Sequence, residues 1–128
     1  MAYSTFGSFI TGKRSARGMT SRELATKLGI SPVHICNIEK DRRAAPPEDY
    51  LEKIAALLRL TPEEKIQMLD LAAKSKSAPS VALDLPEYIN ENDIVRVALR
   101  TAKDADATDE EWLEFIEKLE SRIKRNPK

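Results

Sequence analysis

Residues 21–40 have the sequence SRELATKLGISPVHICNIEK, and two short helical patterns meet within this stretch. Leu24 and Leu28 lie one helical turn apart, so both face the same side of a helix predicted over residues 21–28. Gly29 follows directly and can adopt the positive φ that turns the chain sharply after that helix. The spacing therefore predicts a helix that ends in a tight turn.

A second helix is predicted over residues 32–40, on the other side of the turn. Pro32 opens it at the first helical position, where the missing N–H of proline costs nothing. Ile35 and Ile38 are three residues apart and form its buried side. Ala25, on the preceding helix, is small enough to let the second helix cross closely. Together the two helices predict a helix-turn-helix motif.

Helical patterns also fill the rest of the chain, and no alternation of apolar and polar residues is long enough for a strand. Capping boxes start helices at Thr61 and Thr108, where a glutamate follows each threonine by three residues. Further helices are predicted over residues 5–17, 47–58 and 62–73, after residue 86, and from 108 to about 124. The prediction is an all-α fold with a five-helix domain over 1–74, a short linker over 75–85 and a C-terminal helical segment over 86–128.

The net charge of zero hides an asymmetry between the two halves of the chain. Residues 1–60 contain 10 Lys and Arg against 6 Asp and Glu, a net charge of +4. Residues 61–128 contain 11 against 15, a net charge of −4. A basic first half is typical of a face that binds phosphates, whereas an acidic second half indicates a region that does not contact nucleic acid.

Several other classes of protein find no support in the sequence. No apolar stretch approaches the roughly 20 residues of a membrane span, and the amino-terminal residues lack a signal-peptide pattern. The single cysteine, Cys36, excludes an internal disulfide and favours a reducing compartment, so we expect a cytoplasmic protein. His34 and Cys36 are too few ligands for a zinc site, and no catalytic motif occurs. We therefore expect no enzyme activity, no metal and no cofactor.

The helix-turn-helix stretch resembles the XRE family of regulators, which includes the lambdoid phage repressors. The resemblance extends over about residues 9–60. It rests on Leu-Ala-x-x-Leu-Gly-Ile-Ser at 24–31, Ile-x-x-Ile-Glu at 35–39, the basic turn Arg42-Arg43 followed by Pro46, and Leu-Glu-Lys-Ile-Ala at 51–55. It implies a repressor-like fold for the five-helix domain, double-stranded DNA as a partner, and a transcriptional regulator of prokaryotic or phage origin.

The resemblance also implies which residues face DNA, with the second helix of the motif in the major groove. Five residues match positions at or beside the base edges: Ser31, Pro32, Val33, His34 and Asn37. Five others match positions near the DNA backbone: Thr20, Ser21, Lys40, Arg42 and Arg43. Arg14 and Glu39 match a family pair that forms a structural ion pair.

Some of these positions depart from the family pattern. The family often has glutamine in place of Ser21, and the shorter serine weakens that phosphate contact. Polar residues are common in the family at the positions of Pro32 and Val33, and apolar residues there favour contact with thymine methyl groups. Asn37 is then the candidate for hydrogen bonds to a base, with adenine its natural partner. These departures predict A·T-containing half-sites.

The last predicted helix carries a long apolar stripe that must be buried against the helices predicted over 47–58 and 62–73, against a second copy of the chain or against a different protein. Its members are Trp112, Phe115, Ile116, Leu119 and Ile123. Because DNA half-sites one helical turn apart call for a two-fold dimer, the stripe predicts a homodimer that represses a palindromic operator. The alternative is an antitoxin-like interaction module, in which the C-terminal helices bind a partner protein and DNA binding serves autoregulation.

Overall fold

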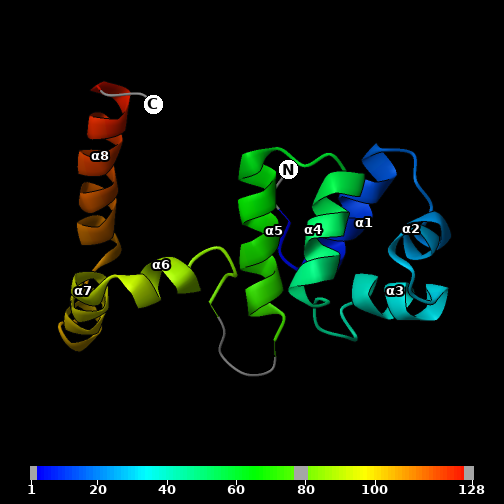
Figure 1. The fold of residues 1–128 in the computed structure, drawn as a ribbon, viewed down its shortest axis with the longest axis horizontal. Helices are drawn as coiled ribbons and strands as arrows, with labels where there is room; N and C mark the ends of the chain where they lie inside the picture. Colours follow the sequence, from blue (N-terminus) through cyan, green and yellow to red (C-terminus); the bar gives the residue numbers. More distant parts are fainter. Residues whose placement is uncertain (1–2, 77–80, 126–128) are drawn as a thin grey trace. The chain divides into compact units, whose positions relative to one another are not determined.

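A computed structural model describes residues 3–76 and 81–125, which form eight α-helices and no strand (Figure 1). The helices are α1 (Phe6–Ala16), α2 (Ser21–Leu28), α3 (Pro32–Glu39), α4 (Glu48–Leu57), α5 (Pro62–Lys74), α6 (Pro86–Glu91), α7 (Asp93–Asp104) and α8 (Asp109–Arg125). The predicted all-α class with an amino-terminal helix-turn-helix domain is confirmed. Across the described residues, no helix is both long and apolar enough to cross a membrane.

The helix starts follow from local capping chemistry. Thr61 and Thr108 cap α5 and α8 as expected, and each hydroxyl accepts a hydrogen bond from the backbone N–H three residues on. Thr5 and Thr20 cap α1 and α2 in the same way. The C-terminal segment contains a break that the sequence did not suggest, because Asn92 adopts extended φ and ψ angles between α6 and α7.

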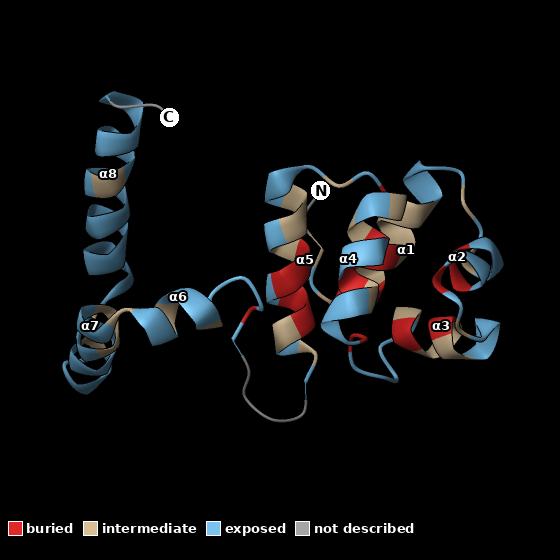
Figure 2. Ribbon diagram, in the orientation of Figure 1, coloured by how far each residue is buried: buried red, intermediate tan, exposed pale blue. Residues whose placement is uncertain are grey.

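The core of the molecule lies among α1 to α5, which are the only helices that contain buried residues in the described part of the chain (Figure 2). Its largest fully buried side chains are Phe6, Phe9, Ile10, Leu24, Ile35, Ile38, Leu51, Ile54, Leu58 and Met68. The four apolar residues that predicted the helix-turn-helix are all buried: Leu24, Leu28, Ile35 and Ile38. This core fixes α2 and α3 against α1.

The chain divides into two compact units between Glu87 and Tyr88. The first unit therefore extends beyond the predicted domain end at residue 74. Ala82 is buried in its core, so part of the predicted linker over 75–85 packs on the five helices. Residues 77–80 of that linker lie outside the described residues.

The second unit contains most of α6 together with α7 and α8, and none of these helices has a buried residue (Figure 2). Large apolar side chains are exposed on both long helices, among them Ile94 and Val97 on α7 and Phe115 on α8. Both helices combine an apolar face with a charged one. This unit presents an apolar face but encloses no core of its own.

Candidate nucleic-acid interface

The turn between α2 and α3 has the geometry that the sequence predicts. Gly29 adopts a φ of 76°, in the left-handed region that favours glycine. Ile30 then donates its backbone N–H to the carbonyl of Ala25, with an N···O distance of 3.1 Å. The Ser31 hydroxyl caps α3 by accepting a hydrogen bond of 3.1 Å from the N–H of His34. These bonds fix the angle at which α3 leaves the turn.

Helix α3 presents its amino-terminal end to solvent and buries one side. Ser31, Pro32 and Val33 are exposed, and Val33 keeps 70% of its surface. His34 and Asn37 are half-buried. Ile35 and Ile38 are buried beneath them. The candidate base-contacting residues thus lie together at one end and on the outer side of α3, where a groove could receive them.

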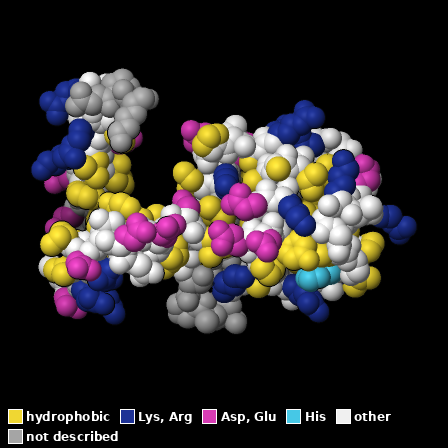
Figure 3. All heavy atoms as spheres, in the orientation of Figure 1, with side chains coloured by type: hydrophobic (Ala, Val, Ile, Leu, Met, Phe, Trp, Pro, Cys, Tyr) yellow, Lys and Arg dark blue, Asp and Glu magenta, His cyan; other side chains and the backbone are white. Residues whose placement is uncertain are grey.

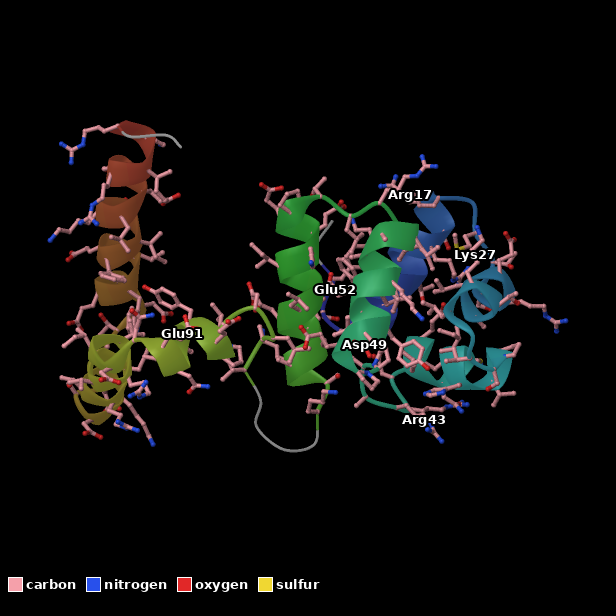
Figure 4. All side chains as sticks on the ribbon, viewed as in Figure 1. Arg17, Lys27, Arg43, Asp49, Glu52 and Glu91 are labelled. Atoms are coloured by element: carbon pink, nitrogen blue, oxygen red, sulfur yellow. The ribbon has the colours of Figure 1, made fainter. Side chains whose placement is uncertain are left out.

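The loop after α3 carries the basic residues assigned to the DNA backbone. Lys40, Arg42 and Arg43 are exposed. The backbone N–H groups of Arg42 and Arg43 both donate to the carbonyl of Asn37, at 2.8 and 3.3 Å, and this folds the loop back onto α3. Figure 4 shows Arg43 at the edge of the unit where α3 and this loop lie. Figure 3 shows a group of acidic side chains over α4 and α5, with basic side chains among and around it.

Thr20 and Ser21, the other two candidates for the backbone, stand at the start of α2. The Thr20 hydroxyl accepts from the Glu23 N–H at 3.1 Å and lies 3.1 Å from the Glu23 carboxylate. Its primary role in the structure is therefore to cap α2, a signal that the spacing of Thr20 and Glu23 already contained. Ser21 is half-buried at the first position of the helix.

Arg14 and Glu39 are brought together as a two-pronged ion pair between α1 and the end of α3. The Arg14 Nε and Nη2 atoms each donate to a Glu39 carboxylate oxygen at 2.9 Å. Arg14 Nη1 also donates to the Met19 carbonyl at 2.9 Å. The two side chains are only 15% and 9% exposed, so the pair is largely shielded from water. It joins α1 to the end of α3.

A surface cavity of about 470 Å³ opens beside the basic loop. The amino-terminal end of α1, the loop after α3 and the carboxyl-terminal end of α5 surround it, with Arg42, Arg43 and Lys74 among its lining residues. Ser75 and Lys76 hold the neighbouring backbone, because Ser75 Oγ accepts from the Ala45 N–H at 2.9 Å and Lys76 Nζ donates to the Ala45 carbonyl at 3.1 Å. Lys74 is a cation near the loop that sequence reasoning missed, since nothing local connects α5 to it.

The five residues of the predicted dimer stripe lie along α8, and none of them is buried. Trp112 is 37% exposed, and Phe115, Ile116 and Ile123 are more so, while Leu119 is half-buried. The Trp112 and Phe115 rings meet edge to face, with centroids 6.0 Å apart. The apolar face of α7 was not assigned to this surface from the sequence, although the three-residue spacing of Ile94 and Val97 is a helical signal.

The described residues contain no group of three or more His, Cys, Asp or Glu side chains that could hold a metal ion. Cys36 is a half-buried free thiol on α3. The arrangement therefore consists of an exposed helix end beside a basic loop in the first unit and an uncovered apolar face in the second.

A helix-turn-helix whose second helix buries one side and exposes its amino-terminal end beside a basic loop is the arrangement of a DNA-binding protein. Residues 13–66 match the model of the family described as Helix-turn-helix, which is of the XRE type. The chain is a DNA-binding transcriptional regulator. Its fold is similar to a solved complex of SinR protein and SinI protein, at 20% sequence identity and a TM-score of 0.48, over 94% of this chain and 99% of that one. No curated protein matches the sequence.

Proposed function

We propose that the protein is a dimeric repressor that binds a palindromic operator, with α3 of each copy in the major groove. The observation that carries the dimer is the uncovered apolar face of α7 and α8, whose helices have no buried residue. A two-fold dimer presents two copies of α3 to half-sites that are about one helical turn apart. Occupation of such a site across a promoter blocks transcription.

Sequence recognition in this proposal comes from the exposed end of α3. Val33 and Pro32 present apolar surface that suits the methyl groups of thymine. Asn37 supplies an amide that can form two hydrogen bonds with adenine, and His34 stands beside it. Each half-site is therefore expected to contain A·T base pairs.

The backbone contacts come from the cations around α3. Arg42, Arg43 and Lys40 lie on the loop after α3 and would fix the register of the protein on the duplex without distinguishing bases. Ser21 and Thr20 at the start of α2 are the corresponding candidates on the other side of the motif. The Thr20 hydroxyl already caps α2, so its contact with a phosphate is the weaker of the two.

A second copy is favoured as the occupant of the apolar face because the charges of α8 complement themselves. Residues 109–117 contain five acidic residues and no basic one. Residues 118–125 contain four basic residues and one acidic. Two α8 helices that run antiparallel would place the acidic half of each beside the basic half of the other, whereas parallel helices would place like charges together. Antiparallel pairing also suits an interface with two-fold symmetry.

The same apolar face would serve a different partner protein, and this is the antitoxin-like alternative. In that case α7 and α8 would bind and inhibit another protein, and DNA binding would regulate the gene of the chain itself. Co-purification of a stoichiometric partner, together with a monomeric purified chain, would favour this alternative over the dimeric repressor.

Sedimentation of the Trp112→Asp variant tests the dimer. We expect the unaltered protein to sediment with twice the 14.4 kDa of one chain and the variant to sediment as a monomer, since a buried unpaired carboxylate is costly. Ser121→Asp is the matched control, because residue 121 lies on the opposite side of α8 from the stripe. An unchanged dimer mass for Trp112→Asp would rule out this interface.

Selection of binding sites from random DNA tests the operator. We expect an inverted repeat of A·T-containing half-sites with centres about 10 base pairs, or a multiple of that, apart. A single asymmetric site would contradict the dimeric repressor.

A further inference from the structure

Asp41 occupies an unusual backbone conformation between the end of α3 and the two arginines of the loop. Its φ is 60°, in the left-handed region that aspartate enters more readily than most residues but less readily than glycine. The side chain is not needed for the turn itself, since glycine would form that turn with less strain. The carboxylate therefore has a role other than forming the turn.

The carboxylate binds the amino-terminal end of α1, 34 residues away in the sequence. One oxygen, Oδ1, accepts a hydrogen bond of 3.0 Å from the backbone N–H of Gly7. The other, Oδ2, accepts one of 2.8 Å from the Thr5 hydroxyl. The first N–H groups of a helix lack intrahelical partners, and the helix dipole favours a negative charge at this end. Asp41 thus fixes the loop after α3 to α1.

The two helices approach so closely at this point that only glycine fits. A Cβ atom added to Gly7 would lie 2.5 Å from the Glu39 carbonyl oxygen, 2.7 Å from the Ile38 carbonyl oxygen and 2.6 Å from Asp41 Oδ1. The start of α1 therefore rests directly against the last turn of α3. Since Arg14 also forms an ion pair with Glu39, α1 contacts the end of α3 at two points, Gly7 and Arg14.

The position of Asp41 determines where the next two residues go. Arg42 and Arg43 follow it directly, and their N–H groups bond to the Asn37 carbonyl. The loop that carries both guanidinium groups is thereby fastened on one side to α3 and on the other to α1. Without the carboxylate, the bonds to Thr5 and Gly7 are lost, and this part of the loop is no longer fixed to α1.

We propose that Asp41 is a positioning residue for DNA binding, which holds Arg42 and Arg43 where they contact phosphates. This inference rests on the backbone role proposed above for the two arginines. It predicts that loss of the Asp41 side chain changes the affinity for DNA in the direction opposite to the one expected from charge alone. Removal of a negative charge beside a DNA-binding face should strengthen the binding of a polyanion, whereas loss of the anchor should weaken it.

Two substitutions separate the charge from the anchor. Asp41→Gly keeps the left-handed turn but removes both hydrogen bonds to α1. Asp41→Asn removes the charge, but its amide oxygen can accept from the Gly7 N–H and its NH₂ group can donate to the Thr5 hydroxyl. Asp49→Asn removes an exposed charge from the start of α4 and serves as the matched control (Figure 4).

The experiment measures fluorescence anisotropy of a labelled random-sequence duplex of about 30 base pairs, titrated at about 50 to 200 mM salt. We expect Asp41→Gly to bind roughly 5-fold to 10-fold more weakly than the unaltered protein and to reduce the log–log salt slope by about 1, the value of one lost phosphate contact. Asp41→Asn and Asp49→Asn should bind as tightly as the unaltered protein or slightly more tightly.

The double variant Arg42→Ala/Arg43→Ala shows whether Asp41 acts through the arginines. In that background Asp41→Gly should cause no further loss of affinity, because the residues it positions are absent. Tighter binding by Asp41→Gly, or an equal loss in both backgrounds, would overturn the inference. If the double variant itself binds as well as the unaltered protein, the proposed backbone role of the arginines fails instead, and the inference falls with it.

Thermal unfolding of each variant distinguishes a loss of folding stability from a displacement of the arginines. A loss of stability alone lowers the melting temperature without a change in the salt slope of DNA binding. If Asp41→Gly is unfolded at the assay temperature, Thr5→Ala replaces it as the test. That variant removes the hydroxyl that donates to Asp41 Oδ2 and should show a smaller reduction of the salt slope. An unchanged slope in Thr5→Ala would then contradict the inference.

Discussion

The two units of the chain are built from the same kind of amphipathic helix, yet only one of them encloses a core. The first unit buries ten large side chains almost completely. Helices α6 to α8 bury none, although Trp112, Phe115 and Ile94 are as apolar as any residue of the first unit. Helical periodicity therefore identifies which face of a helix is apolar, but it does not identify what covers that face.

The size of the second unit explains this difference. A segment of about 40 residues rarely buries enough apolar surface to offset the conformational entropy lost on folding. The first unit is about twice as long and surrounds its core on several sides. A second copy of the chain would supply the apolar surface that this unit lacks, and this is the basis of the proposed dimer.

The largest effect on stability is expected when a phenylalanine is replaced by alanine in each unit, since only the first unit encloses a core. Phe9 is fully buried, so Phe9→Ala should lower the unfolding free energy of the first unit by about 3–5 kcal/mol. Phe115 is 51% exposed, and Phe115→Ala should leave that free energy unchanged while it weakens the dimer. Hydrogen exchange of amides in α1 to α5, with sedimentation of both variants, gives the two measurements. A similar loss of protection in Phe115→Ala would show that the units are not independent.

An intermediate effect is expected from the shielded ion pair. Arg14→Ala leaves the 9% exposed carboxylate of Glu39 without its partner and should destabilise the first unit by about 3 kcal/mol. The matched control is Lys65→Ala, whose pair with Glu52 is 38% and 55% exposed, and a loss of less than about 1 kcal/mol is expected there. Chemical denaturation measures both. Equal losses would contradict the distinction between the two pairs.

The smallest effect concerns the pH dependence of the contact between α1 and α5. The hydrogen bond from Lys13, followed by that from the Thr61 backbone N–H, lowers the pKa of Glu64 from 4.5 to about 2. Because the pKa is lower in the folded state, the contact stabilises the protein fully above about pH 4.5 and is lost as the pH falls towards 2. Solvent screens this surface pair, so we expect only about 1 kcal/mol.

Denaturation of Glu64→Gln and of the unaltered protein from neutral pH down to about pH 2 measures this contribution. The variant should be less stable than the unaltered protein at neutral pH, and the difference should shrink as both are acidified. A difference that stays constant down to pH 2 would assign the stabilisation to something other than the charge of Glu64.

The parts of the fold that could be predicted from the sequence are those with local causes. The apolar spacing of Leu24 and Leu28, the turn at Gly29 and the cap at Thr61 all act within a few residues. The anchor between Asp41 and Gly7 could not be predicted, because it joins residues that are distant in sequence and no short pattern marks it. The packing of Ala82 into the first core was missed for the same reason.

One part of the candidate site, the exposed end of α3, could be predicted from the sequence, whereas the contribution of α5 could not. The exposed end of α3 follows from the buried positions of Ile35 and Ile38, since the opposite side of the helix must face outward. The contribution of Lys74 to the cavity depends on the packing of α5, which the sequence does not reveal. The roles of individual residues on DNA remain predictions, as does the partner of α8.

The absence of buried residues from α6 to α8 has a consequence for how steeply the regulator would respond to its own abundance. If a second copy supplies the missing core, the population of operator-competent protein rises with the square of the chain concentration while monomers predominate. Halving the cellular amount would then reduce that population by about fourfold. Such a protein can turn a gradual change in its synthesis or degradation into a sharp change in transcription, without any small-molecule signal.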